Sequence, residues 1–172
     1  MKKSMSYKGR RKKKRYFEGW YYKSVTADQQ FTVSLIPVIS KNQKDPHAFI
    51  QVIVNDHHQI MTEYIRYPIE AFHYDYNDDV LSIEKNVFGI NEIHLNIQRD
   101  TINITGSLQL DNHQPITKSL LSPSIMGFFS YLPYMECNHD VVSMNHSVDG
   151  KLMINDQKLS FLDGKGYIEK DY

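Results

Sequence analysis

Carboxylates and a histidine lie close together in the last third of the sequence, where they could transfer protons. Glu169 and Asp171 stand in the strand-like run 167–171, and alternation along a strand places both on one face. Glu136 and His139 lie between an aromatic run and an apolar strand. Side chains of these types act as general acids and bases when a fold positions them. We therefore predict four catalytic candidates, which are Asp171, Glu169, Glu136 and His139.

Each of these residues also has a structural interpretation. Glu169 and Asp171 could form a surface ion pair with Lys170 or join a satisfied buried network, since most carboxylates are not catalytic. Glu136 and His139 could instead tie a loop to the body of the fold. The sequence leaves these alternatives open.

Aromatic side chains are abundant and are candidates for the wall of a ligand site. The chain has 12 Tyr and 8 Phe, and such rings offer broad apolar surface, to which Tyr adds a polar tip. The ligand-binding candidates are Glu18, Trp20, Tyr21, Tyr131 and Tyr134. The alternative is that the aromatic residues are plain core and that Glu18 accepts backbone N–H groups.

Other site chemistries find little support in the sequence. Glu136, His139 and His146 lack the tight, repeated spacing of a zinc site. Cys137 has no base partner that the sequence can place, and 164–166 (Gly-Lys-Gly) lacks both the spacing and the helix of a phosphate loop. We therefore expect neither a metal nor an organic cofactor.

The elements that must position the candidates are strands, because apolar residues alternate with period two from Phe17 onward. Gly106 interrupts one such run, where we expect a bulge. Asp149-Gly150 predicts a two-residue hairpin turn, and Asp111-Asn112 predicts another turn. A short helix or turn could occupy Pro123–Ser130. The predicted strands are Trp20–Thr26, Gln30–Ile39, His47–Val54, Ile60–Tyr67, Ala71–Tyr76, Val80–Glu84, Glu92–Gln98, Thr101–Leu110, Val141–Val148 and Lys151–Ile154.

This spacing of short strands predicts an all-β fold. About ten strands separated by turn signals indicate an antiparallel, lipocalin-like barrel or curled sandwich with little helix. A barrel of about eight strands is wide enough to hold one small ligand. We expect one β domain over residues 16–172, preceded by a basic disordered leader over residues 1–15.

The leader carries a strong charge asymmetry. Residues 1–15 hold nine of the 20 Lys and Arg and no acid, whereas the remaining residues carry 11 bases against 20 acids. The simplest interpretation is a solvated tail. An alternative is weak attraction to an anionic membrane, at roughly 1 kcal/mol per charge near the surface. Nucleic-acid binding is less favoured, because the body offers no second basic patch.

The sequence is also typical of a cytoplasmic protein. Cys137 is the only cysteine, which excludes an intramolecular disulfide and is compatible with a reducing compartment. The basic start is not followed by the apolar run of a secretory signal, and no window approaches the roughly 18 apolar residues of a membrane span. We expect a cytoplasmic location, with peripheral membrane contact through the leader left open.

Three segments resemble the tocopherol cyclase family and its bacterial relatives. Residues 16–23 read YFEGWYYK, residues 124–143 read SIMGFFSYLPYMECNHDVVS, and residues 164–171 read GKGYIEKD. The family pattern is roughly YFEGWYFK, then MG-F-F-P-MECYHGVVS, then GYIEKDWG, in the same order. It continues with Trp-Gly and roughly another half-length. The resemblance therefore implies an amino-terminal half, whose carboxy-terminal half could be encoded separately.

The resemblance implies an intramolecular lyase or isomerase that cyclises a prenylated phenol or quinol to a chromanol ring. A protonated carboxylic acid would start the reaction, and aromatic faces would stabilise the cation by about 0.5–2 kcal/mol each. A dry, apolar cavity would exclude water. Two other hypotheses remain, which are a non-catalytic lipocalin-type module that binds an isoprenoid or other lipid, and an electrostatic interaction protein using residues 1–15.

Overall fold

The computed structural model describes residues 5–12, 14–116 and 138–172, and it confirms an all-β fold with little helix. Two short 3-10 helices, η1 (Gly9–Arg11) and η2 (Ile69–Ala71), accompany the strands. The strands are β1 (Phe17–Val25), β2 (Thr32–Ser40), β3 (His47–Asn55), β4 (Ile60–Pro68), β5 (Phe72–Asp75), β6 (Val80–Ile83), β7 (Asn86–Phe88), β8 (Glu92–Gln98), β9 (Asn103–Gln114), β10 (His139–Ile154), β11 (Gln157–Ser160) and β12 (Gly164–Asp171).

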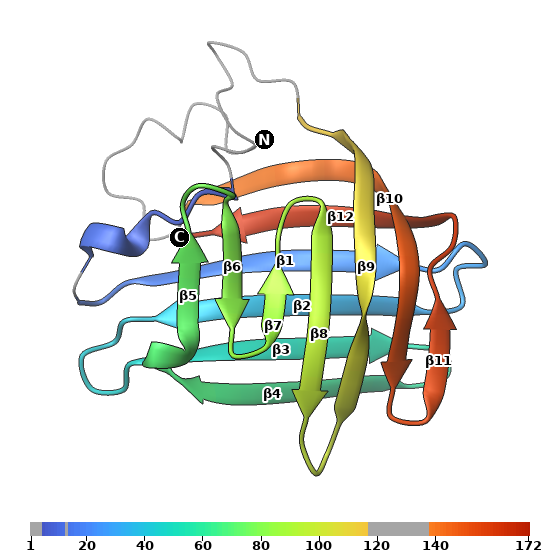
Figure 1. Cartoon of the computed structure of the whole chain (residues 1–172), viewed down its shortest axis with the longest axis horizontal. Coiled ribbons are helices and arrows are strands. Elements are labelled where there is room, and N and C mark those ends of the chain that lie inside the picture. The colour runs from blue at the N-terminus through green and yellow to red at the C-terminus, as the bar shows by residue number, and fades with distance from the viewer. Residues whose placement is uncertain (1–4, 13, 117–137) are drawn as a thin grey trace.

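The strands form one antiparallel sheet that curls into a nearly closed barrel. Its order is β4-β3-β2-β1-β12-β10-β9-β8-β7-β6-β5, and β11 pairs with β10 beside this path. Figure 1 shows the short strands β5 to β8 running across β1 to β4, so that the two ends of the sheet enclose the interior. β12 lies between β1 and β10 and joins two meanders.

The interior is filled by the side chains that alternation predicts. Ile93, Leu95 and Ile97 of β8 are buried, as are Val33 and Leu35 of β2. They belong to one continuous apolar cluster that draws on nearly every strand. Period-two alternation therefore identifies the inward face correctly.

The predicted hairpin at Asp149-Gly150 is wrong, because β10 runs straight through it. Gly150 (φ +132°) lies opposite Leu108, and Gly106 (φ +135°) lies opposite Leu152. A Cβ on either glycine would lie 2.2 Å from a carbonyl oxygen of the facing strand. The two glycines thus allow β9 and β10 to approach in a backbone conformation that side chains disfavour. The predicted bulge at Gly106 is also wrong, since its pairing partners stay in register.

One other turn prediction fails for a related reason. Asp111-Asn112 lies inside β9, where Asn112 has a φ of +58° and the pairing with β10 shifts, so the pair makes a bulge rather than a turn. The hairpin that ends β10 is instead at Asn155-Asp156. The short strands β7 and β11 were not predicted. Pro123–Ser130 lies outside the described residues.

The N-terminal segment, residues 5–9, packs against the barrel rather than extending into solvent. Met5 and Tyr7 are buried, at 1% and 9% exposure. The expectation of a disordered leader therefore does not hold for this segment. Its two apolar side chains interrupt the basic run, and burying them offsets the cost of ordering the chain.

Candidate functional site

His139 of β10 lies between two carboxylates of β12. Its Nδ1 is 2.5 Å from Asp171 Oδ1, and its Nε2 is 3.2 Å from Glu169 Oε2. β10 pairs with β12 so that His139 lies opposite Asp171. Glu169 lies two residues earlier on the same outer face of β12 and is also close to the histidine ring. The Tyr167 hydroxyl donates to Glu169 Oε2 at 2.5 Å. We call His139, Tyr167, Glu169 and Asp171 the acid–base cluster.

Charge in the acid–base cluster favours a proton on His139. Burial lowers the pKa of His139, but the hydrogen bond and charge of Asp171, with the charges of Glu169 and Asp140, outweigh it and raise the pKa above its ordinary value. Burial, and then the hydrogen bond to Glu169, raises the pKa of the Tyr167 hydroxyl. The two neighbouring carboxylates therefore favour the imidazolium form of His139, which can donate a proton, and the carboxylates can accept one.

The acid–base cluster lies on the outer face of the barrel. The side chains of His139, Glu169 and Asp171 are 32%, 23% and 40% exposed. Tyr21 shares this face, with its ring 6.3 Å from that of Tyr167 and its hydroxyl 3.0 Å from Ser34 Oγ. Lys170 points the opposite way and is fully buried, so the surface ion pair that we considered for Glu169 and Asp171 does not form.

On the inner face, Lys170 pairs with Glu18. Lys170 Nζ lies 2.5 Å from Glu18 Oε1, and both side chains are fully buried. The Tyr16 hydroxyl donates to Glu18 Oε2 at 2.5 Å, and the backbone N–H groups of Lys8 and Gly9 donate to the same carboxylate at 3.0 Å. Glu18 thus accepts backbone N–H groups, as the structural interpretation of this residue expects. Burial lowers the pKa of Lys170, and Glu18 opposes that effect.

Trp20 and its neighbours close the same end of the barrel. Trp20 is fully buried, and its ring lies 6.2 Å from Phe72 and 6.4 Å from Tyr74. We call Glu18, Trp20, Phe72, Tyr74 and Lys170 the barrel mouth. Trp20 is therefore a core residue of the barrel mouth, packed by other aromatic rings.

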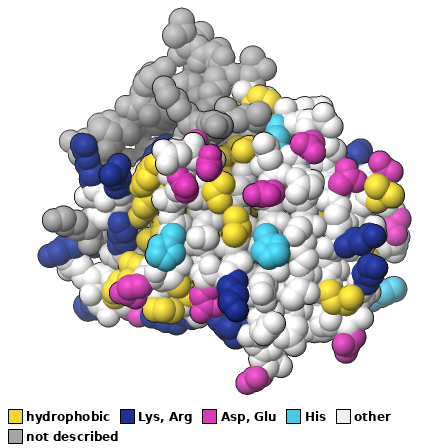
Figure 2. Space-filling model, in the orientation of Figure 1, with side chains coloured by type: hydrophobic (Ala, Val, Ile, Leu, Met, Phe, Trp, Pro, Cys, Tyr) yellow, Lys and Arg dark blue, Asp and Glu magenta, His cyan; other side chains and the backbone are white. Residues whose placement is uncertain are grey.

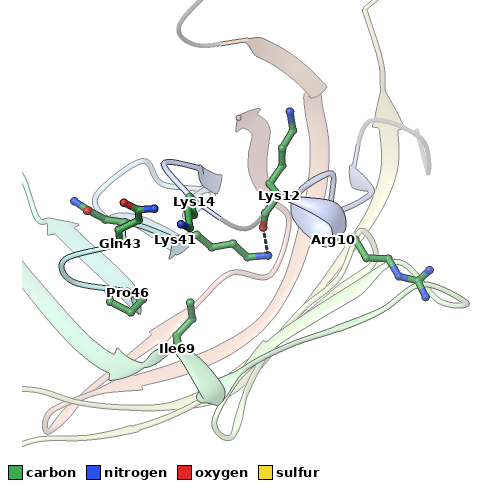
Figure 3. Close-up of a pocket in the computed structure, with 8 residues that line it drawn as sticks. Arg10, Lys12, Lys14, Lys41, Gln43, Pro46 and Ile69 are labelled. Carbon is green, nitrogen blue, oxygen red and sulfur yellow. Dashed lines mark hydrogen bonds between the residues drawn. The ribbon is translucent and has the colours of Figure 1, made fainter.

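A basic groove of about 670 Å³ lies beside the N-terminal segment (Figure 3). Lys41 crosses it and donates from Nζ to the carbonyl oxygens of Gly9 (2.7 Å) and Lys12 (3.0 Å). The side chains that line the groove are Arg10, Lys12, Lys14, Lys41, Asn42, Gln43, Pro46 and Ile69. The face over β5 to β9 differs, because acidic and basic side chains are interspersed across it (Figure 2).

Three smaller hollows, of about 470, 360 and 350 Å³, lie elsewhere on the barrel. Within the described parts of the chain, none of the four hollows is lined by Trp20 or by the acid–base cluster. The candidate residues of the inner face thus contact packed side chains rather than an open space.

Some predicted site residues cannot be placed. Glu136, Tyr131 and Tyr134 lie outside the described residues. Among residues 5–12, 14–116 and 138–172, no group of three His, Cys, Asp or Glu is arranged to hold a metal ion. His146 is buried against the ring of His113 at 4.8 Å, and its Nδ1 is 3.2 Å from Ser143 Oγ. The described segments also contain no helix with the length and apolar character to cross a membrane.

Four residues of these groups were not among the sequence candidates, namely Tyr167 of the acid–base cluster and Phe72, Tyr74 and Lys170 of the barrel mouth. Tyr16, which donates to Glu18, was not a candidate either. A signal for Lys170 exists, because a lysine at the inward position after Ile168 needs a buried counterion, and Glu18 is the acid at an inward position of a neighbouring strand. Tyr167 has a weaker signal in its period-two alignment with Glu169.

Comparison with known proteins shows the fold. No family model matches the chain, and no curated protein matches it. CghA in complex with Sch210972 matches with a TM-score of 0.59 at 10% identity, over 90% of this chain and 45% of that one. CghA alone also gives 0.59, at 9% identity over the same shares. A putative AttH protein from Nitrosomonas europaea gives 0.52 at 12% identity, over 90% and 50%. The chain thus spans about half the length of these solved proteins and shares its barrel fold with that part of each.

Proposed function

We propose that the chain is a cyclase-like barrel that closes a chromanol ring on a prenylated phenol or quinol. The observation that carries the proposal is the position of His139 between Asp171 and Glu169, three predicted catalytic residues that converge from two separate segments. The structure of CghA with Sch210972 adds that a protein of this fold has been captured with a ligand.

The reaction requires two proton transfers and no redox step. A proton adds to the trisubstituted alkene of the prenyl tail, the phenol oxygen captures the tertiary cation, and the phenol proton leaves. In our proposal the His139 imidazolium supplies the first proton, and Asp171 or Glu169 accepts the second. The rings of Tyr21 and Tyr167 stabilise the cation by about 0.5–2 kcal/mol each.

Such a cation needs protection from water, and the acid–base cluster is partly exposed. We propose that a second half covers this face. The chain's match to 45–50% of the solved proteins supports this arrangement. The covering half would complete the site and exclude solvent.

The test uses the full chain and a prenylated hydroquinone, with the chromanol measured by chromatography and mass spectrometry. His139→Gln is expected to lower the rate at least about 100-fold. The matched control is His73→Gln, which changes an exposed histidine of β5 and should leave the rate unchanged. Equal rates for wild type and His139→Gln would contradict the proposal, as would an inert wild type at every pH with and without a candidate second half.

A non-catalytic lipid-binding module is the second candidate. It is favoured by the exposure of the acid–base cluster, which would protect a cation poorly. It predicts that an isoprenoid changes the fluorescence of Trp20, the only tryptophan, without any product forming. Formation of the chromanol product would favour the enzyme over the binding module.

We also propose that the basic groove makes weak contact with an anionic membrane surface. Lys41 binds the backbone carbonyls of Gly9 and Lys12, which holds the cations that line the groove close together, so their charges act together. Lys12→Glu/Lys14→Glu should abolish sedimentation with vesicles that contain phosphatidylserine, and added salt should weaken the wild-type signal. Binding that survives both changes would contradict this contact.

A further inference from the structure

Side chains of the barrel wall donate to the N-terminal segment, residues 5–9, which we call the N-terminal plug. Trp20 Nε1–H donates to the carbonyl oxygen of Met5 at 2.9 Å. The Tyr74 hydroxyl lies 3.4 Å from the same oxygen, but its nearer acceptor is Asp79 Oδ1 at 2.9 Å. Lys170 Nζ donates to the carbonyl oxygen of Ser6 at 2.5 Å. Two wall side chains, Trp20 and Lys170, therefore donate to the carbonyl oxygens of Met5 and Ser6.

The apolar part of the N-terminal plug fills an aromatic enclosure. The Met5 side chain is fully buried, and the Tyr7 ring lies 5.3 Å from Phe72, 5.7 Å from Tyr74 and 6.3 Å from Trp20. An apolar body attached to a carbonyl group is thus the chemistry that the barrel mouth accepts.

The N-terminal plug is separate from the sheet and fits incompletely. Residues 5–9 belong to no strand, and the hydrogen bonds described above between them and the wall use wall side chains. The buried Tyr7 hydroxyl has no hydrogen-bond partner among the described residues, which costs free energy that an apolar group in its place would not. Another molecule can therefore replace the plug without breaking any strand pairing.

We propose that the barrel mouth is a binding site for a small amphipathic molecule with an apolar chain and a carbonyl oxygen, and that the N-terminal plug occupies this site in its absence. The ligand chain replaces Met5 and Tyr7, and its carbonyl oxygen accepts from Trp20 and Lys170. The site lies inside the barrel, on the face opposite the acid–base cluster, and it does not depend on the proposed reaction.

The first experiment uses the wild-type chain and 2-undecanone as the probe. Because Trp20 is the only tryptophan, its indole N–H gives a single NMR signal from the barrel mouth. Saturable binding should shift this signal and reduce the hydrogen-exchange protection of the Lys8 and Gly9 amides, which Glu18 holds in the plugged state. Undecane, which lacks the carbonyl, should bind at least about tenfold more weakly.

The second experiment weakens the N-terminal plug without removing its backbone. Met5→Ala/Tyr7→Ala should increase the affinity for 2-undecanone at least about tenfold, because less of the population is plugged. The matched control is Met153→Ala/Tyr64→Ala, which truncates an exposed methionine and an exposed tyrosine and should leave the affinity unchanged.

Three results would overturn the inference. They are a Trp20 signal that stays fixed in both wild type and Met5→Ala/Tyr7→Ala, equal affinities for undecane and 2-undecanone, and full protection of the Lys8 and Gly9 amides at saturation. If the plug variant fails to fold, the wild-type titration decides alone. His139→Gln should bind 2-undecanone like wild type, so loss of cyclisation and loss of this site are distinguishable.

Discussion

The carboxylate of Glu18 and the ammonium of Lys170 lie 2.5 Å apart, and neither side chain is exposed. β1 and β12 place them on the same inner face, so the pair fastens the first strand to the last one described. The N-terminal segment adds two backbone donors to the same carboxylate. Electrostatics inside the barrel thus hold three separate parts of the chain together.

Replacing Lys170 with Met should destabilise the fold strongly, because Glu18 would remain buried without its counterion. Breaking a buried pair from one side costs about 3–5 kcal/mol. Glu18→Gln/Lys170→Met should cost less than the sum of its single changes, as measured by urea denaturation. The exposed pair Asp45–Arg66 is the control, and Asp45→Asn should change stability little. A Lys170→Met protein as stable as this control would contradict the prediction.

The raised pKa of His139 should appear in the pH dependence of stability. A histidine whose pKa is higher in the folded state contributes stability that is fully present below its unfolded value, roughly 6.5, and that is lost as pH rises through the folded value. The free energy of unfolding of wild type relative to His139→Gln should therefore fall from mildly acidic to alkaline pH. A flat difference across this window would show that Asp171 and Glu169 do not hold the proton on His139.

His146 should behave in the opposite way. Burial, and then the charge of His113, lowers the pKa of His146 to about 4. The unfolded chain therefore binds the proton more readily, and stability should fall as pH drops from about 6.5 towards 4, by up to about 3 kcal/mol. His146→Phe keeps a ring against Gly166 and should remove this acid sensitivity. An NMR titration of the His146 ring protons, with exposed His73 as the reference, checks the value directly.

Gly106→Ala should destabilise the barrel by well over about 1 kcal/mol. Gly106 has a φ of +135°, and a Cβ there would lie 2.2 Å from the carbonyl oxygen of Lys151. Gly89→Ala is the matched control, because its Cβ would lie 3.4 Å or more from its nearest neighbours. Thermal unfolding should give a lower midpoint for Gly106→Ala than for Gly89→Ala. Equal midpoints would show that β9 and β10 can shift to accommodate the added Cβ.

Local pattern predicted most of the strands, and its failures have physical causes. The predicted strand Glu92–Gln98 coincides with β8, because one buried face imposes alternation over seven residues. The hairpin prediction at Asp149-Gly150 was wrong because a glycine can supply a positive φ both in a turn and where two paired strands approach closely. β7 and β11 have three and four residues, too few for a period to emerge.

The candidate site was only partly predictable. Alternation correctly places Glu169 and Asp171 on one face, which is a local property of β12. The approach of His139 to both carboxylates depends on the register between β10 and β12, and the pairing of Glu18 with Lys170 depends on that between β1 and β12. Such registers join distant parts of the chain, and no short pattern encodes them.

The place of β12 between β1 and β10 also sets an order of assembly. During synthesis, β1 to β4 and β5 to β10 can each form from neighbouring hairpins as they leave the ribosome. These two parts of the sheet cannot join until β12 has been synthesised, because β1 and β10 each pair with β12. A nascent chain stalled before Gly164 should therefore expose unpaired strand edges and apolar surface on two separate sheets. It should need a chaperone until β12 is synthesised.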